Sequence, residues 1–222
     1  MVAAALFLRN PPALPVQPGN NDSAGGAATA EAIRDRRMWL IIVAFLFFFF
    51  GSQIIMVHLV NYATDVGIEP LVAATFIGVI GAVSIFSRLS IGVIAEKIGP
   101  YLSLIIMCLI LAAVFVMLLF TRSVWSFYLC AVLFGIPYGG EVTQIPLVIG
   151  RFFGTRNMAT LMGISVFGIN LGGAFGAWIS GWIFDATDSY RWAFIAGAVS
   201  AVISLAVVLM LKRQDAGKAG AE

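Results

Sequence analysis

Residues 38–60 read MWLIIVAFLFFFFGSQIIMVHLV, an unbroken apolar run that contains no Asp, Glu, Lys or Arg. A helix needs about 20 consecutive apolar residues to cross the roughly 30 Å hydrocarbon core of a bilayer. The run is continuous, whereas a strand of a membrane barrel alternates apolar and polar residues. This stretch therefore predicts a membrane-spanning helix.

Five further runs of the same kind follow along the chain. They cover residues 71–95, 101–120, 124–150, 157–184 and 192–211. One such run could be a helix buried in a soluble core, but six in succession, each long enough to span, favour the bilayer. We therefore expect an all-α integral membrane protein with six transmembrane helices.

The composition supports a membrane protein and excludes several other classes. Hydrophobic residues make up 61% of the chain and charged residues 11%, whereas soluble proteins are about 45–50% apolar and about 25% charged. These values exclude a cytosolic enzyme, a nucleic-acid-binding protein and a disordered tail, and the net charge of +2 is too small to indicate a polyanionic partner. Cys108 and Cys130 both lie in apolar runs, so no disulfide framework, metal site or cofactor is predicted.

The sequence divides into three parts. Residues 1–37 predict a linker-like cytoplasmic segment, because residues 10–29 are rich in Pro, Gly, Ala, Asn and Ser. The six-span bundle occupies residues 38–211, and residues 212–222 are predicted to form a cytoplasmic tail.

Basic residues alternate between the connections. Of the 13 Lys and Arg, only Arg122 and Arg191 fall in the connections after the first, third and fifth runs. The others lie in or beside the N-terminal segment, the connections after the second and fourth runs, and the tail. Since Lys and Arg concentrate on the cytoplasmic side, both termini are predicted to be cytoplasmic, with the bundle in the plasma (inner) membrane.

Two ionisable residues lie inside the predicted spans. Arg88 lies about 10 Å before the end of the second run, and Glu141 about 13 Å before the end of the fourth, at 1.5 Å per helical residue. Both runs cross in the same direction, so the opposite charges are expected to pair or to face each other across a cavity. Either they form a buried ion pair that only sets packing, or Arg88 binds an anionic substrate and Glu141 carries a proton.

Three uncharged polar residues accompany them as candidate substrate ligands. Asn170 lies near the middle of the fifth run, Gln53 lies midway along the first, and Tyr138 lies one turn before Glu141. The alternative is that these side chains form interhelical hydrogen bonds, each worth about 0.6–2 kcal/mol.

Glycines line one face of the fifth run. Gly168, Gly172 and Gly176 are spaced by four residues and therefore share one side of a helix. Such a face lets a neighbouring helix approach closely. We therefore expect these three glycines to lie at a helix-packing interface.

The connection after the second run carries a motif of a known family. The stretch Gly92-Val-Ile-Ala-Glu96-Lys97-Ile-Gly99 resembles the G-x-x-x-D-[RK]-x-G loop of the major facilitator superfamily, with Glu in place of Asp. Glycine permits close helix contact there, and the carboxylate can cap a helix or pair with a base. This resemblance implies a gating role for the loop, in which these contacts latch one conformation.

The residues around Arg88 narrow the resemblance. Residues 85–92, IFSRLSIG, are similar to the eighth helix of monocarboxylate transporters and of oxalate/formate-type antiporters. The resemblance implies that Arg88 contacts the carboxylate of a small organic anion, a monocarboxylate or a dicarboxylate. The acidic residue that those carriers often place four residues earlier is Ser84 here. The proton-coupling role is therefore assigned to Glu141.

The resemblance also implies an architecture. Carriers of this superfamily have two six-span halves, and this chain is similar to the C-terminal half. Its six spans would form two inverted three-helix repeats, and alternating access would rock one half against the other. The expected partners are the lipid bilayer, the organic anion, and either an N-terminal six-helix half or a second copy of the chain.

Other functions remain as alternatives. The chain could be a six-span fragment or an interaction module without transport activity of its own, or a half-transporter that works as a homodimer. An enzyme is not expected, because no His, Asp and Glu cluster with metal-ligand spacing and no nucleophile elbow occurs in the sequence. No ATP-binding G-x-x-x-x-G-K-[ST] motif occurs either, so coupling to a gradient or to exchange is predicted.

Overall fold

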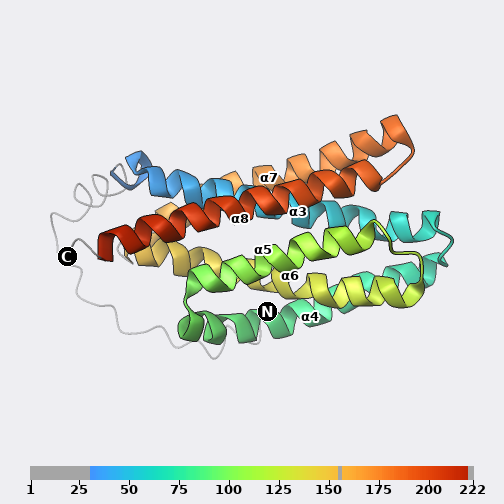
Figure 1. Cartoon of the computed structure of the whole chain (residues 1–222), viewed down its shortest axis with the longest axis horizontal. Coiled ribbons are helices and arrows are strands. Elements are labelled where there is room, and N and C mark those ends of the chain that lie inside the picture. The colour runs from blue at the N-terminus through green and yellow to red at the C-terminus, as the bar shows by residue number, and fades with distance from the viewer. Residues whose placement is uncertain (1–30, 155–156, 220–222) are drawn as a thin grey trace, which may run out of the picture.

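Six long helices run side by side in alternating directions (Figure 1). The structure is a computed structural model that describes residues 31–154 and 157–219. The helices are α3 (Arg36–Asp65), α4 (Pro70–Ile98), α5 (Pro100–Leu118), α6 (Val124–Phe153), α7 (Met158–Thr187) and α8 (Arg191–Ala219). All six are long and apolar enough to cross a membrane, and the described part of the chain contains no strand. The predicted all-α membrane fold is confirmed.

Most helices extend beyond the apolar runs that predicted them. The first begins at Arg36, and the last continues through Ala219 into the predicted tail. Polar residues at helix ends reach the headgroup region, so a helix can exceed the hydrocarbon thickness. Residues 1–30 of the predicted linker-like segment, residues 1–37, lie outside the described residues, whereas residues 31–34 and 36–37 are helical. Residues 220–222 of the predicted tail also lie outside the described residues.

Local sequence explains the sharp connections. Pro70 and Pro100 occupy the first turn of α4 and α5, where the missing N–H costs nothing. Gly99 alone separates α4 from α5 and has a φ of +85°, a conformation that favours glycine. Ser123 and Ser126 form a capping box at the start of α6.

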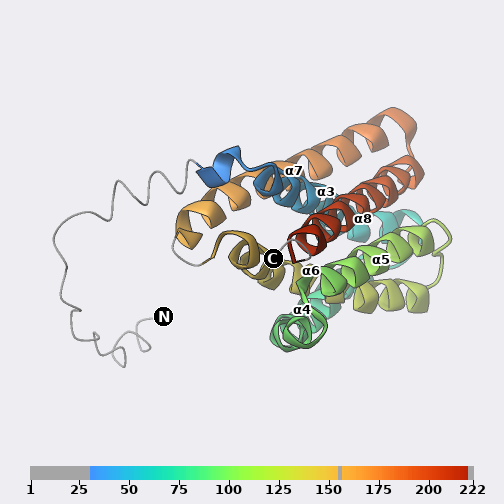
Figure 2. The same ribbon diagram turned by 60° about the vertical axis from the view of Figure 1, so that its left-hand side comes forward.

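The helix contacts repeat within the bundle. Helix α3 packs against α7 and α8, whereas α6 packs against α4 and α5. Exchanging α3, α4 and α5 for α6, α7 and α8 converts the first set of contacts into the second and leaves the α5–α8 contact unchanged. Each unit has three helices, so the second unit starts from the opposite side of the membrane. The two units are inverted three-helix repeats, and Figures 1 and 2 show α3 and α6 lying between the outer helices α7 and α4.

Glycines permit the closest helix contacts. A Cβ on Gly172 or Gly176 of α7 would overlap the backbone carbonyl of Leu46 or Phe50 in α3. In the other repeat, a Cβ on Gly139 of α6 would overlap the backbone of Ser84 in α4. Both main helix pairs therefore rest on backbone-to-backbone contact that only glycine allows.

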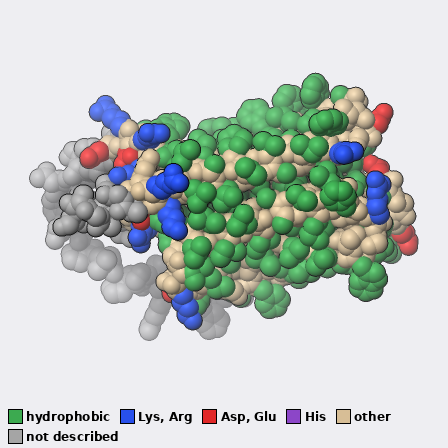
Figure 3. All heavy atoms as spheres, viewed as in Figure 1, with side chains coloured by type: hydrophobic (Ala, Val, Ile, Leu, Met, Phe, Trp, Pro, Cys, Tyr) green, Lys and Arg blue, Asp and Glu red, His purple; other side chains and the backbone are tan. Residues whose placement is uncertain are grey.

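The surface matches a bilayer. Apolar side chains cover the middle of the visible face, whereas Lys, Arg, Asp and Glu gather at the two ends (Figure 3). The five Trp side chains are all at least 54% exposed, as expected for residues that face lipid and its headgroups. We call the end that holds the start of α3 and the end of α8 the terminal end, and the opposite end the far end.

Helices α4 and α7 are the least covered. In their most apolar stretches 28% of the residues are buried, compared with 50% in α3 and α5. The exposed side chains of α4 include Phe86 and Leu89, and those of α7 include Phe167 and Phe175. These two helices therefore leave large apolar side chains uncovered in the described chain.

We expect Gly176→Ala to lower the free energy of unfolding by about 1–3 kcal/mol, because the added methyl group would push α7 away from the Phe50 backbone. The thermal or denaturant midpoint of the purified chain in detergent measures this change. Gly172→Ala should match it. Gly168→Ala should cost less, since the atom in its way is a methyl group of the Ile42 side chain.

Gly163→Ala is the matched control in the same helix, because no atom lies within 4 Å of its added Cβ. It should leave the midpoint unchanged or raise it slightly, since alanine favours helix over glycine. Equal loss of stability at positions 163 and 176 would contradict the close-contact interpretation.

Candidate functional site

Five polar candidates lie close to the middle of their helices. Gln53, Tyr138, Glu141 and Asn170 lie within about one turn of the midpoints of α3, α6 and α7, and Arg88 lies about 6 Å past the midpoint of α4, at 1.5 Å per residue. Helices α4 and α6 end three residues beyond the predicted runs, so Arg88 and Glu141 lie farther from their helix ends than the sequence suggested. Substrate sites of secondary transporters lie at this level of the membrane.

Arg88 is exposed on the uncovered side of α4. Its neighbour Ser87 is buried and donates a hydrogen bond of 2.6 Å to the backbone oxygen of Ile136, which holds α4 against α6. Phe86 and Leu89 flank the arginine and are exposed as well. The guanidinium forms no ion pair with any described residue, so its charge is available to a group outside this bundle.

Glu141 lies inside the bundle, not on the open side with Arg88. Its side chain is buried at 1% exposure. One carboxylate oxygen, Oε2, accepts a hydrogen bond of 3.2 Å from Ser52 of α3, and the other, Oε1, has no hydrogen-bond partner among the described residues. The expected pairing or facing of Arg88 and Glu141 across a cavity is therefore wrong for this conformation.

The physical reason lies in the rotation of α6. Gly139 must face α4 to allow the close contact with Ser84. Glu141 follows two residues later, about 200° around the helix, and so faces the opposite way, toward α3 and α5. Arg88 still lies close enough for its charge to act on both Glu141 and Tyr138.

A second buried polar residue lies one turn beyond Glu141. Gln144 is fully buried, and its Nε2 donates a hydrogen bond of 2.6 Å to Ser103 of α5, while its Oε1 has no partner among the described residues. Sequence analysis did not single out Ser52 or Ser103. Each is one serine in an apolar run, and only the packing of three helices brings it to a buried carboxyl or amide group.

The other polar candidates do not form one cluster with Arg88. Asn170 is exposed on α7, and its amide donates a hydrogen bond of 2.7 Å to Val166 of the same helix. Gln53 is half-buried in the α3–α7 contact, next to Gly173. Tyr138 is half-buried and packs against Phe134, with 5.4 Å between the ring centres. Helices α4 and α7 lie on opposite sides of α3 and α6 (Figure 1).

The motif residues lie at the terminal end. Glu96 and Lys97 are exposed in the last turn of α4, and no atom lies within 4 Å of a Cβ built on Gly92. The close contact expected at Gly92 is therefore not made within this bundle. Glu96 and Gly99 line a cavity of about 560 Å³ together with Arg151.

Glu96 forms no ion pair with a described residue in this cavity. Arg151, the basic residue of this lining, instead pairs with Asp215 of α8 at 2.7 Å between Nε and Oδ2. Its guanidinium also lies over the Tyr101 ring, 5.8 Å from the ring centre. These contacts join α5, α6 and α8 at the terminal end and leave the Glu96 carboxylate open to another partner.

Comparison with known proteins supports one family. The model of the Major Facilitator Superfamily matches residues 1–124 and 102–222. Monocarboxylate transporter 12 of Xenopus laevis is 28% identical over 169 residues, which cover 73% of this chain and 36% of that protein. An uncharacterized MFS-type transporter of Escherichia coli, YhjX, is 23% identical over 185 residues, which cover 78% of this chain and 43% of that protein.

Solved structures show the same fold. The transporter FucP in its outward conformation superposes with a TM-score of 0.71 at 18% identity, covering 95% of this chain and 51% of FucP. An auto-inhibited POT family peptide transporter gives a TM-score of 0.68 at 19% identity, covering 81% of this chain and 37% of that protein. The chain thus spans about half, or less, of the length of the proteins it matches. With six helices in two inverted repeats and matches to the family model along its length, the chain belongs to the Major Facilitator Superfamily.

Proposed function

We propose that the chain acts as the C-terminal half of a secondary transporter that moves a small organic anion, a monocarboxylate or a dicarboxylate, by alternating access. A gradient or exchange drives the movement. Similarity to several monocarboxylate transporters supports the substrate class, and the family is one of transporters.

The observation that carries this proposal is the position of Arg88. An arginine at the middle of a membrane helix costs about 2.5–3.5 kcal/mol unless water or a counter-charge surrounds it. Arg88 has neither a carboxylate from the described chain nor burial within the bundle. A water-filled passage that admits an anion supplies Arg88 with both water and a counter-charge. A guanidinium binds a carboxylate through two parallel hydrogen bonds.

Glu141 is the proposed proton carrier. Burying a carboxylate charge without a paired cation costs several kcal/mol, whereas a protonated carboxyl group needs only hydrogen bonds. Glu141 has one hydrogen bond, from Ser52, and one oxygen without a partner. The charge of Arg88 reaches it, so an anion that binds Arg88 and neutralises it changes the energy of proton loss from Glu141.

A second six-helix unit completes the proposed carrier. The uncovered helices α4 and α7, each with an exposed polar side chain near its middle, would face this unit across the passage. An N-terminal half agrees with the length of the relatives, which are at least about twice as long as the matched part of this chain. In this proposal both termini are cytoplasmic, the terminal end faces the cytoplasm, and the far end faces outward from the plasma (inner) membrane.

Arg88→Ala should abolish saturable uptake or weaken apparent substrate affinity by about thirtyfold or more, since losing one partner of a desolvated charge pair costs about 2 kcal/mol or more. Labelled lactate uptake is measured in proteoliposomes made with the carrier purified from its native membrane, including any copurifying partner. Arg213→Ala, at the exposed terminal end, should leave uptake unchanged.

Arg88→Lys should recover part of the uptake, because the charge remains while the two-pronged hydrogen bonding is lost. Unchanged affinity in Arg88→Ala would refute the anion site. Saturable uptake by the chain alone would indicate that the partner is a second copy of the chain and not an N-terminal half. If no preparation shows saturable uptake, the result would favour a fragment or an interaction module.

Glu141→Gln should remove the dependence of net uptake on external pH and leave substrate exchange active. Glutamine keeps the shape and the hydrogen bond from Ser52 but does not take up a proton. Initial rates between about pH 5 and pH 8 measure the effect. Glu69→Gln is the matched control, because Glu69 is an exposed carboxylate just before α4 that makes no capping hydrogen bond. An unaltered pH profile in Glu141→Gln would reduce Glu141 to a structural residue.

A further inference from the structure

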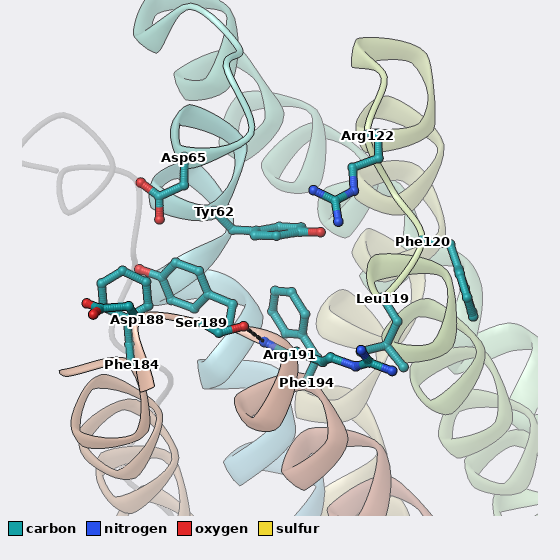
Figure 4. Close-up of a pocket in the computed structure, with 11 residues that line it drawn as sticks. Tyr62, Asp65, Leu119, Phe120, Arg122, Phe184, Asp188, Ser189, Arg191 and Phe194 are labelled. Atoms are coloured by element: carbon teal, nitrogen blue, oxygen red, sulfur yellow. Dashed lines mark hydrogen bonds between the residues drawn. The ribbon is translucent and has the colours of Figure 1, made fainter. Parts of the chain in front are cut away.

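The far end of the bundle contains a cavity that is separate from Arg88. It has a volume of about 540 Å³ and lies between the end of α3, the α5–α6 connection and the start of α8. Its lining includes Arg122 of the α5–α6 connection and Arg191, the first residue of α8 (Figure 4). These are the two basic residues that the sequence places on this side of the membrane.

Neither arginine is neutralised within the described chain. Both side chains are exposed, and neither guanidinium forms an ion pair with a described residue. The acidic residues of the same cavity, Asp65 and Asp188, lie on the side away from both arginines (Figure 4). The cavity therefore has a basic wall and an acidic wall.

Hydrogen bonds fix the backbone that carries the two arginines. The Tyr62 hydroxyl of α3 donates to the backbone oxygens of Leu118 at 3.0 Å and Thr121 at 3.2 Å. This contact fixes the connection that carries Arg122, whose guanidinium points toward the Tyr62 ring (Figure 4). The backbone N–H of Arg191 donates to the Ser189 hydroxyl at 3.3 Å, which fixes the start of α8.

Aromatic rings form the apolar part of the cavity. The Tyr62 and Phe194 rings meet edge to face, with 4.8 Å between their centres. Phe184 and Tyr190 stack with 4.3 Å between their centres. All four residues line the cavity. Rings in this arrangement hold flat apolar groups, and cavities of about 300–1,000 Å³ hold small molecules.

We propose that this cavity is a second binding site, for a monoanionic carboxylate with a flat apolar body such as an aromatic acid. The carboxylate binds Arg122 and Arg191, and the ring of the ligand packs against Tyr62 and Phe194. A dianion is disfavoured, because its second carboxylate would point toward Asp65 across the cavity. Binding here is independent of the proposed transport. A role of this site in capturing the anion before it is transported rests on the proposed function.

Benzoate is the probe, and the full chain in lipid nanodiscs is the protein. Isothermal titration should show benzoate binding, with the uncharged isostere benzamide at least tenfold weaker. The double variant Arg122→Ala with Arg191→Ala should weaken benzoate binding at least tenfold. Arg213→Ala, an exposed arginine at the opposite end, should leave binding unchanged. Circular dichroism and size-exclusion profiles check that the variants fold.

Asp65→Asn provides a gain of function that misfolding does not mimic. Removing the opposing charge should tighten benzoate binding by about two- to fivefold, the range for exposed charge pairs. It should also raise the affinity for the dianion terephthalate by a larger factor. Equal binding of benzoate by the wild type and the double variant, or of benzoate and benzamide by the wild type, would overturn the proposal.

Arg88→Ala separates this site from the proposed transport site. Benzoate binding that persists in Arg88→Ala and is lost when Arg122 and Arg191 are also replaced supports the far-end site, whatever the outcome of the uptake experiments. Binding lost in Arg88→Ala alone would assign the ligand to the α4 site and overturn the far-end site.

Discussion

The structure depends on two helix pairs whose backbones touch. Helix α7 lies on α3 through Gly172 and Gly176, and α6 lies on α4 through Gly139. In a bilayer the hydrophobic effect does not favour one apolar helix contact over contact with lipid, so close packing decides which helices associate. The two pairs correspond under exchange of the repeats, yet the glycines lie on the outer helix α7 in one pair and on the inner helix α6 in the other.

This packing also decides where each polar side chain lies. Once Gly139 faces α4, the helical rotation places Glu141 among α3 and α5, with Ser52 as its hydrogen-bond donor. Arg88 remains on the uncovered side of α4. A buried carboxyl group and an exposed guanidinium are thereby kept apart but within electrostatic reach. The two side chains therefore do not form an ion pair in this conformation.

Several features could be predicted from the sequence because they follow from local chemistry. The apolar runs, the proline and glycine residues at helix ends, and the four-residue glycine spacing each depend on neighbours along the chain, and the structure has six helices at these positions. The predicted positions of the helix ends were less accurate. Residues such as Arg36, Lys212 and Arg213 are helical although they are charged, since apolarity marks the hydrocarbon core and helix formation continues beyond it.

The sequence by itself determined the membrane fold, the number of helices and the resemblance to one superfamily, because hydrocarbon thickness and backbone hydrogen bonding leave few choices for such apolar runs. Only the tertiary structure decided that Glu141 is enclosed and Arg88 is not, that Ser52 and Ser103 contact buried polar groups, and that Arg122 and Arg191 line one cavity. Those outcomes depend on the rotation of each helix about its axis and on contacts between distant segments. The side-chain volumes at the helix interfaces set these rotations and contacts, and the sequence of a single helix does not reveal them.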